Sequence, residues 1–415
     1  MIKIFFIETP STAVQHGVGT YAANLINSLE RYNECVVYYV QIKFGTGAAF
    51  SETKQKKGVY KIQIQFEDPV VQKKQETAIH PLQARVIFCM LSQYFTVEGY
   101  NVFHLNSLLQ RTIGDIAKEY DYKIVLTLHV SLWRVFFNNS KQGFIEKWNS
   151  KDLADQKSVG LLSMREEEKM CKEADRIICL TEESKDFISH YYKANDDKAV
   201  VIPNGLIMDT IASKNEIDNI RKSLGFALTD FIFIYVGRLI EQKGIGVLLD
   251  AFKKIAKRSG SIKLLVVGSG NTDTFLSRIF ECCGQVTFTG YQPVENLSKL
   301  YKIANCGVMP STTEQSSFVV LEMLSKKLPV ILSDIDAFSK FENEKHVTKV
   351  KTDDRGYVFV DLLYKAMKHV FEDATYRTRI AENGHQLFLD HYQANTMAAK
   401  THNVYRNVIG LPSIV

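Results

Sequence analysis

The sequence predicts an α/β protein of two domains, each built on a parallel sheet with crossover helices. Short β-branched runs alternate with longer amphipathic stretches along the whole chain, as in strands joined by crossover helices. The pattern stops at residues 201–205, where a strand end is followed by turn residues, and then starts again. With 415 residues, the chain is long enough for two domains of about 200 residues each.

The composition is typical of a soluble globular protein, with 46% hydrophobic and 23% charged residues. No apolar run approaches the roughly 20 residues that span a bilayer, and the first run, which ends before Glu8, is too short for a signal peptide. We therefore expect a cytoplasmic protein, with peripheral contact at the inner face of a membrane left open. The net charge of +5 is small and suits anionic small-molecule substrates better than nucleic acid.

The seven cysteines do not form a recognisable metal-binding or disulfide pattern. Their odd number and the lack of C-x-x-C spacing argue against a disulfide framework and a zinc site, so no metal is expected. Cys282 and Cys283 are adjacent in a predicted helix and are expected to be buried free thiols.

In the first half, two-residue alternation and buried apolar runs predict strands, and longer amphipathic stretches predict helices. The expected strands are residues 2–7, 36–42, 60–65, 102–105, 123–128, 176–180 and 200–202. Helices are expected at 21–31 and 108–120, and residues 54–57 and 66–80 are expected to be solvated loop and edge. A linker between the domains is expected near 206–226.

The second half repeats this architecture without repeating the sequence. Its expected strands are residues 231–236, 263–267, 286–289, 306–309 and 330–332, and its expected helices are 247–257, 272–282, 294–303 and 317–326. Two further helical stretches end the chain, the last at 394–408.

The first chemical motif follows the strand that ends at residue 236. Gly237 lets the backbone approach a ligand closely, and Arg238 and Lys243 place two cations near the start of the next helix. Helix amino termini and cations together suit a diphosphate. The alternative is a glycine turn with two solvated cations, and the placement of both cations favours the phosphate site.

Two more glycine turns follow later strands. Gly268 and Gly270 come after the strand at 263–267, and Gly290 follows the strand at 286–289. Because ligands of open α/β sheets bind at the carboxyl ends of strands, the three turns predict one ligand-binding edge.

The third motif is a pair of glutamates seven residues apart. Glu314 lies in the loop after the strand at 306–309, and Ser316 or Ser317 is expected to cap a helix that carries Glu322 in its second turn. One carboxylate can serve a sugar or an acceptor, and the other can accept hydrogen bonds from both hydroxyls of a ribose. The alternative for Glu322 is a solvated carboxylate beside the helix start.

These motifs together resemble the family 4 retaining glycosyltransferases of the GT-B fold (glycosyltransferase group 1), along nearly the whole chain. Further matches in family order are Gly17-Val-Gly19, Thr127-Leu-His129 and Ile202-Pro-Asn-Gly205. The resemblance implies two Rossmann-like doubly wound parallel-sheet domains facing each other across a cleft. It implies an acceptor domain at 1–205, a nucleotide-sugar domain at 206–390, and a terminal helix at 391–415 packed on the first domain.

The resemblance also implies roles for the motif residues. Arg238 and Lys243 would hold the donor diphosphate, Glu314 would face the transferred sugar, and Glu322 would bind the ribose. His129 would lie near the reacting sugar, although a histidine at a strand end is often structural. The remaining donor contacts would come from Gly17, Gly19, Gly237, Gly268, Gly270, Tyr291, Ser316 and Ser317.

The activity implied is metal-independent hexosyl transfer from a nucleotide-diphosphate sugar, with a UDP-sugar expected first and a GDP-sugar second. Domain closure about residues 204–207 would exclude water. The acceptor would be a glycan, a lipid-linked saccharide or a peptide hydroxyl. Trp133, Phe136 and Trp148 form an aromatic stretch after His129 that could bind it, dip into a bilayer or simply pack between helices.

The sequence departs from the family pattern at several positions. Gln315-Ser316-Ser317 replaces the usual Gly-Phe-Gly, and Asp334-Ile-Asp336 replaces a Gly-Gly. Lys327 stands where a helix-ending glycine is usual, so a positive φ or a different helix end is expected there. His16 takes the place of the first of two glycines. These departures indicate a divergent subgroup.

Three other functions could use parts of this sequence pattern. An NAD-dependent oxidoreductase would need a third glycine after Gly17-Val-Gly19, and it leaves the cations and the glutamate pair unexplained. A sugar-nucleotide epimerase or hydrolase could use the same fold. A catalytically silent partner subunit would fit the altered residues 315–317, but it does not explain why the charged residues are intact.

Overall fold

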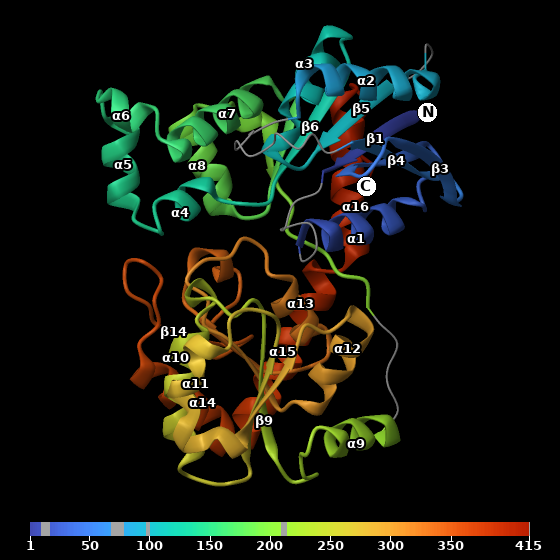
Figure 1. Ribbon diagram of the computed structural model, residues 1–415. Coiled ribbons are helices and arrows are strands. Elements are labelled where there is room, and N and C mark those ends of the chain that lie inside the picture. Colours follow the sequence, from blue (N-terminus) through green and yellow to red (C-terminus); the bar gives the residue numbers. More distant parts are fainter. Residues whose placement is uncertain (10–16, 68–78, 97–99, 209–213, 415) are drawn as a thin grey trace. The chain divides into compact units, whose positions relative to one another are not determined.

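The computed structural model describes residues 1–9, 17–67, 79–96, 100–208 and 214–414 and contains two compact units (Figure 1). The amino-terminal unit consists of Met1–Phe137, Lys141–Gly205 and Ala394–Val415. The carboxyl-terminal unit consists of Leu206–Gln393, together with the short segment Asn138–Ser140.

The amino-terminal unit is built on an eight-stranded sheet in the order β3-β4-β2-β1-β5-β6-β7-β8. The strands are β1 (Ile2–Glu8), β2 (Cys35–Gly45), β3 (Ala49–Lys56), β4 (Val59–Glu67), β5 (Tyr100–Leu105), β6 (Lys123–Leu128), β7 (Arg176–Cys179) and β8 (Ala199–Val201). Each strand expected in this half is present, and all are parallel. The expectation of an all-parallel sheet is wrong at one edge, because β3 pairs with β4 in antiparallel fashion. The loop expected at 54–57 is wrong as well, because β3 extends to Lys56. Every residue of β3 is exposed, so no apolar alternation marks this strand in the sequence.

The helices of this unit pack on the sheet and fill the connections. They are α1 (Gly19–Leu29), α2 (Pro81–Leu91), α3 (Arg111–Glu119), α4 (Leu132–Phe136), α5 (Lys141–Asn149), α6 (Leu153–Gln156), α7 (Val159–Glu173), α8 (Glu182–Tyr192) and α16 (Ala394–Val408), with short 3-10 segments at Ser92–Tyr94, Leu108–Gln110 and Asp196–Lys198. The helix expected at 108–120 therefore begins as a 3-10 turn. Residues 66 and 67 of the loop expected at 66–80 belong to β4, and residues 68–78 lie outside the described residues.

The last helix, α16, packs against α1 and β6 of the amino-terminal unit. Arg406 on this helix donates to both carboxylate oxygens of Glu34, at 2.5 and 2.7 Å. The buried Tyr405 hydroxyl lies 2.6 Å from Nδ1 of His104 on β5. These two contacts hold α16 on the amino-terminal unit, although the helix lies far from the strands of that unit in the sequence.

The carboxyl-terminal unit has a six-stranded, fully parallel sheet in the order β11-β10-β9-β12-β13-β14. Its strands are β9 (Phe231–Val236), β10 (Ile262–Val267), β11 (Val286–Gly290), β12 (Cys306–Met309), β13 (Val330–Ser333) and β14 (Thr348–Val350). In both units the chain order across the sheet reverses beside the first strand, as in doubly wound nucleotide-binding sheets. The α/β, doubly wound fold class predicted from the sequence is confirmed.

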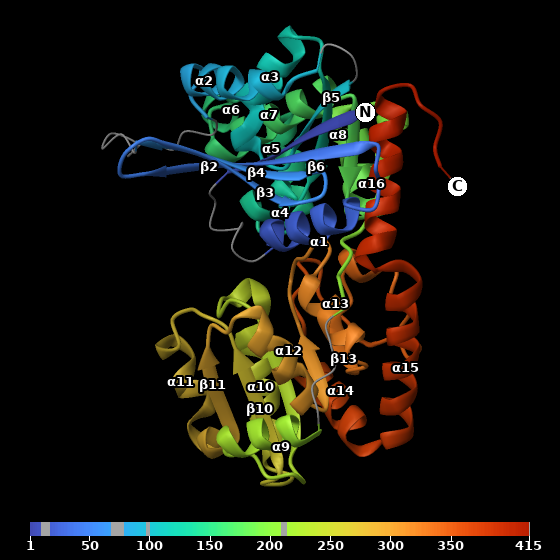
Figure 2. The same ribbon diagram turned by 90° about the vertical axis from the view of Figure 1, so that its right-hand side faces the viewer.

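The helices of the carboxyl-terminal unit are α9 (Lys214–Ser223), α10 (Ile245–Ala256), α11 (Asp273–Ile279), α12 (Val294–Ile303), α13 (Phe318–Ser325), α14 (Val360–Glu372) and α15 (Ala374–His391), with 3-10 segments at Glu241–Lys243, Phe280–Gln285 and Asp336–Phe338. Figure 2 shows α15 beside α13 and α14, which it contacts. The linker expected at 206–226 is wrong in part, because α9 lies within it. Arg221 of α9 donates to the carbonyls of Leu228 and Ile303, which joins this helix to the domain.

Two local predictions have different outcomes. Lys327 adopts φ of 55° just after α13, so the positive φ expected at this non-glycine helix end is confirmed. The expectation for the cysteine pair is wrong for Cys283, which is exposed in a 3-10 segment whereas Cys282 is buried. No helix among the described residues combines the length and the apolar character needed to cross a bilayer.

Candidate functional site

The glycine turns of the carboxyl-terminal unit form one layer at the carboxyl edge of its sheet. The Gly237 amide donates to the Val267 carbonyl at 2.9 Å, and the Gly268 amide donates to the Gly290 carbonyl at 2.9 Å. A Cβ on Gly268 would lie 1.8 Å from the Gly237 oxygen, and φ of Gly268 is 143°. The structure thus brings the three turns together and leaves room for no side chain between the first two.

The turn that carries Lys243 is fixed to the loop after β12. Gly244, with φ of 72°, separates the 3-10 turn Glu241–Lys243 from α10, and a Cβ there would lie 2.1 Å from the Pro310 oxygen. The Thr312 amide donates to the Gln242 carbonyl at 2.9 Å. Because backbone meets backbone here, the position of Lys243 relative to the 310–314 loop is set by the main chain.

Lys243 and Glu314 form an ion pair, with Nζ 2.6 Å from Oε1. The two side chains are only 22% and 11% exposed, so solvent weakens this pair less than a surface pair. Arg238 is exposed, and its carbonyl accepts a hydrogen bond from the Tyr235 hydroxyl at 2.8 Å. The ligand-free site therefore has one cation already neutralised by a carboxylate and one directed to solvent.

Glu322 lies in the second turn of α13, as expected, and its orientation is fixed by a residue that the sequence did not indicate. The buried Tyr301 hydroxyl of α12 donates to Glu322 Oε2 at 2.6 Å. Ser317 occupies the N-cap position of α13, one of the two positions expected, but its side chain makes no cap hydrogen bond. Ser316 is partly buried before this helix, and Tyr291 is 58% exposed after β11.

The other predicted residues lie in the amino-terminal unit. Gly19 begins α1 and Gly17 lies two residues before it, where a Cβ on Gly17 would meet none of the other described residues within 4 Å. His16 lies outside the described residues.

His129 follows β6 and contacts groups from two other elements. Its Nε2 lies 3.0 Å from Asn106 Oδ1, and its ring packs edge-on against Tyr21 with centroids 4.6 Å apart. Since the Asn106 amide nitrogen donates to the Ile7 carbonyl, Oδ1 accepts and His129 Nε2 carries the proton. Burial lowers the pKa of His129 to about 3, so its imidazole is neutral at physiological pH and Nδ1 can accept a hydrogen bond.

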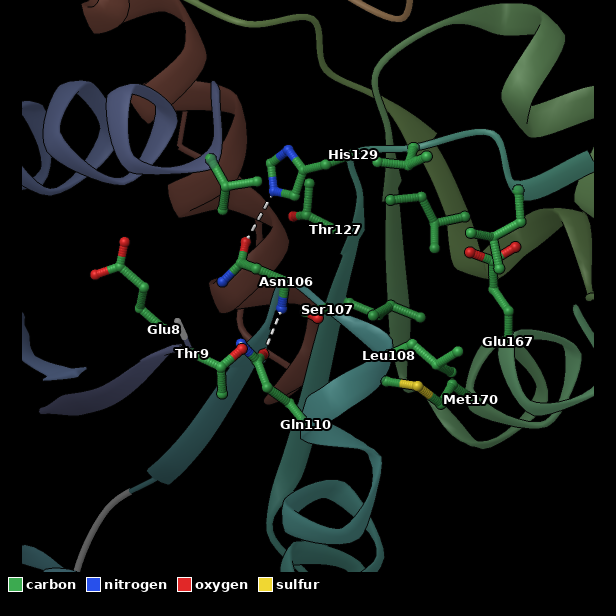
Figure 3. Close-up of a pocket in the computed structure, with 15 residues that line it drawn as sticks. Glu8, Thr9, Asn106, Ser107, Leu108, Gln110, Thr127, His129, Glu167 and Met170 are labelled. Carbon is green, nitrogen blue, oxygen red and sulfur yellow. Dashed lines mark hydrogen bonds between the residues drawn. The ribbon is translucent and has the colours of Figure 1, made fainter. Parts of the chain in front are cut away.

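His129 is part of the wall of a pocket of about 180 Å³ (Figure 3). The pocket lies at the carboxyl ends of β1, β5 and β6, where the strand order reverses and ligands of such sheets bind. Its described lining is Glu8, Thr9, Val18, Asn106, Ser107, Leu108, Gln110, Leu126, Thr127, Leu128, His129, Val130, Leu132, Glu167 and Met170. Of these, His129 alone was expected as a site residue, although Val18, Thr127 and Leu128 lie within the motifs that match the family.

Most of the aromatic stretch after His129 packs between helices. Trp133 is 4% exposed and contacts Phe144 and Phe187, and Trp148 packs on Phe144 beneath the Arg165 guanidinium. The alternative of ordinary helix packing therefore accounts for both indoles. Phe136 is 41% exposed and remains available to a ligand.

Glu167 lines the same pocket and has a perturbed carboxyl group. Burial raises its pKa from the ordinary 4.5 to about 7, although the Tyr192 hydroxyl donates to Oε2 at 2.7 Å. In the folded protein Glu167 keeps its proton up to about pH 7, whereas in the unfolded chain it loses the proton near pH 4.5. The contribution of Glu167 to the free energy of unfolding is therefore fully present below pH 4.5, and it decreases as the pH rises from 4.5 to about 7.

We expect Glu167→Gln to raise Tm at pH 8 and to leave it unchanged at pH 4. The gain should be about 2 kcal/mol at pH 8, after allowance for the solvent contact of the partly buried side chain. Thermal melts of both proteins across this pH range measure the effect, with the exposed Glu119→Gln as control. A difference in Tm between the two proteins that does not depend on pH would contradict the raised pKa of Glu167.

No group of three or more His, Cys, Asp or Glu side chains in the described part of the chain is placed to hold a metal ion.

Two family models match the chain. Glycosyltransferase Family 4 matches residues 16–209, and Glycosyl transferases group 1 matches residues 216–387. An uncharacterized glycosyltransferase of Methanocaldococcus jannaschii is 29% identical over 244 residues, which cover 56% of this chain and 60% of that protein. The phosphatidyl-myo-inositol mannosyltransferase of Mycobacterium tuberculosis is 27% identical over 214 residues, which cover 51% of this chain and 55% of that protein.

Solved structures share the fold over nearly the full chain. Sucrose-phosphate synthase from Thermosynechococcus elongatus superposes with a TM-score of 0.73 at 18% identity and covers 99% of both chains. Anabaena HepE in complex with UDP and glucose gives a TM-score of 0.69 at 15% identity, covering 98% of this chain and 100% of HepE.

Proposed function

The chain belongs to the family 4, group 1 glycosyltransferases of the GT-B fold, and from this premise we propose that it transfers a sugar from a nucleotide-diphosphate sugar to an acceptor hydroxyl. We propose further that the anomeric configuration is retained and that no metal is required. The observation that carries the proposal is the Lys243–Glu314 pair beside the layered glycine turns of the carboxyl-terminal unit.

Donor binding would use the main chain as much as the side chains. The turns at Gly237 and Gly268 expose backbone that no Cβ covers, and α10 begins directly after Gly244 with its amide dipoles toward the same edge. Arg238 and Lys243 would hold the two phosphates. Since Lys243 is paired with Glu314 without a ligand, the diphosphate would compete for its ammonium group and release Glu314 to accept hydroxyls of the transferred sugar.

The ribose would bind Glu322. Tyr301 donates to one oxygen of this carboxylate and so sets its rotamer before the nucleotide arrives. Preorganised acceptors of this kind lose little entropy on binding. Tyr291, Gly270 and the serines at 316 and 317 would complete the donor contacts.

The chemical step would break the bond between the anomeric carbon and the diphosphate oxygen and form a bond to the acceptor oxygen. The departing phosphate would take the proton of the acceptor hydroxyl on the same face of the sugar. Negative charge grows on the leaving group, and fixed cations and amide dipoles stabilise it without reorganisation. Neutral His129 would accept a hydrogen bond at Nδ1 near the reacting sugar, and Gly17 and Gly19 would supply backbone to the phosphates. NMR of the product decides the stereochemistry, and an inverted anomeric carbon would contradict retention.

The first test is donor recognition. Ligands that bind only the native state raise Tm, so UDP, GDP, ADP and dTDP can be compared directly. We expect UDP to give the largest shift and GDP the second, each reduced in Lys243→Ala. If no diphosphate shifts Tm, the proposed function fails.

Incubation with a UDP-sugar alone separates the proposal from its alternatives. A transferase releases nucleotide slowly until an acceptor is added. Rapid formation of free sugar or of an epimer would favour a hydrolase or an epimerase, and donor binding without turnover across an acceptor panel would favour a silent partner subunit.

A further inference from the structure

Gln315 carries a buried hydrogen-bond acceptor that the protein itself does not use. Its Oε1 is excluded from solvent, and no donor among the described residues reaches it. Buried amide oxygens normally have a partner, as for the buried Gln110, whose Oε1 accepts from the Asn106 amide at 2.7 Å. A buried oxygen without a partner raises the free energy of the folded state. The protein thus keeps the unpaired oxygen of Gln315 at a cost in stability.

Gln315 lies where ligands of open α/β sheets bind. It belongs to the loop between β12 and α13 and directly follows Glu314. In the sheet of this unit, the chain order reverses between the neighbouring strands β9 and β12, and ligands bind at the carboxyl ends of strands at such a reversal. The same loop carries the carboxylate that pairs with Lys243. The unused acceptor therefore follows directly after one of the two charges at the centre of the proposed donor site.

The main chain of this loop is fixed, so the position of Gln315 does not depend on contacts of its own side chain. The Ser333 hydroxyl donates to the Ser311 carbonyl at 2.5 Å, and a Cβ on Gly356 would lie 2.3 Å from the Thr312 oxygen. Because no hydrogen bond from the described residues holds Oε1, the amide can turn toward a ligand without losing one. A fixed backbone with an uncommitted acceptor loses little entropy when a ligand binds.

The chemistry of the unused atom restricts its ligand to a hydrogen-bond donor. An amide oxygen only accepts, so the diphosphate oxygens of a nucleotide sugar are not its partner. In the proposed function the ribose hydroxyls bind Glu322, and the base lies beyond the ribose. The transferred sugar is attached directly to the diphosphate, and Glu314 would accept from its hydroxyls. The hydroxyls of this sugar are thus the donors nearest to Gln315.

We propose that Gln315 selects the transferred sugar by accepting a hydrogen bond at Oε1 from one of its hydroxyls. The inference rests on the proposed function and specifies its donor. A sugar that carries fluorine in place of this hydroxyl would leave Oε1 unpaired in the complex, and sites built to bind a hydroxyl reject such analogues strongly. Gln315 is one of the positions at which this sequence departs from the family pattern, so the selection would be a property of this chain.

The unpaired oxygen predicts opposite effects of one substitution on stability and on binding. Gln315→Met keeps the length of the side chain and removes the acceptor. We expect the Tm of the ligand-free protein to rise by roughly 2–4 °C, because an apolar group replaces an unsatisfied polar one. Affinity for the sugar nucleotide should fall about tenfold, whereas affinity for UDP, which has no transferred sugar, should stay the same. Gln386→Met is the matched control and should change none of these values, since Gln386 is an exposed residue of α15.

The decisive experiment combines the variant with altered ligands. Isothermal titration calorimetry with UDP-glucose, UDP-galactose, UDP-N-acetylglucosamine and GDP-mannose identifies the tightest donor, which is then used with fluorine replacing one hydroxyl at a time. We expect one derivative to bind the wild type about tenfold more weakly than its parent, and to bind Gln315→Met within about twofold of its parent. Fluorine does not donate a hydrogen bond, and its electronic effect on the sugar is the same for both proteins. Gln315→Glu retains an acceptor and should keep the preference for the same hydroxyl.

The inference is overturned if each fluorinated derivative loses the same affinity for the wild type and for Gln315→Met. It is also overturned if Gln315→Met weakens UDP as much as the sugar nucleotide, because Gln315 would then support the nucleotide site and not select the sugar. If no nucleoside diphosphate raises the Tm of the wild type, the proposed function itself fails. That result does not involve Gln315, so the two failures are distinguishable.

Discussion

Lys243→Ala is expected to lower kcat by a factor of about 10² to 10³, equivalent to roughly 3–4 kcal/mol of transition-state stabilisation. The ammonium group of Lys243 lies in a partly buried turn whose backbone is fixed by Thr312, so water cannot readily replace it. The fall in kcat has a second cause. Without Lys243, the Glu314 carboxylate has lost its cation and would repel the phosphates of the donor. Donor KM is therefore expected to rise together with the fall in kcat.

Steady-state kinetics with saturating acceptor measure both parameters. Lys254→Ala is the matched control, since Lys254 lies on α10 and pairs with Asp361 at the surface. Adding Glu314→Gln to Lys243→Ala should recover part of the donor affinity and none of kcat, because the repulsive charge is removed but the cation is still missing. Unchanged kcat in Lys243→Ala would exclude this lysine from the site.

Arg238→Ala tests the second cation. Arg238 is exposed in the ligand-free protein, and its guanidinium would bind the diphosphate from the solvent side of the turn. We expect a loss of turnover of the same order, roughly 2–4 kcal/mol, with no change in Tm in the absence of nucleotide. Undiminished turnover would contradict its role.

The central strands could be predicted from the sequence because their burial leaves a strong signal. Phe231–Val236 is buried at every position and was predicted to the residue. The sheet edges lack this signal, since β3 is exposed throughout and β14 has three residues. Helix α9 was missed because its composition is polar and it lies where a linker was expected.

The candidate site could be predicted as a set of residues but not as a set of contacts. Lys243 and Glu314 are 71 residues apart, and what brings them together is a backbone contact between Gly244 and Pro310 that no local pattern encodes. The sequence indicates only that Lys243 and Glu314 carry opposite charges and lie at the same edge of the sheet. The pocket residues Glu8 and Glu167 were missed for the same reason, because each is an isolated acid on a different element.

For the aromatic stretch after His129, the sequence indicates a cluster of residues but not their role. Clustered aromatic residues are as typical of helix packing as of ligand binding, and the sequence does not say which helices lie nearby. Trp133 is covered by Phe144 and Phe187, and Phe187 comes from α8, more than fifty positions along the chain. Only the tertiary arrangement separates Phe136, which is partly exposed, from its buried neighbours.

Gly268→Ala is expected to destabilise the carboxyl-terminal unit by about 3 kcal/mol or more and to abolish the Tm shift by nucleotide. An L-residue at φ of 143° is strained, and its Cβ would lie 1.8 Å from the Gly237 oxygen, so the donor turn must move. For a domain of this size the loss corresponds to a fall in Tm of about 10 °C. Gly260→Ala is the matched control, because a Cβ there meets nothing within 4 Å and φ is not positive. If Gly268→Ala kept the Tm and the nucleotide response of the control, the contact between the two turns would not be needed to build the donor site.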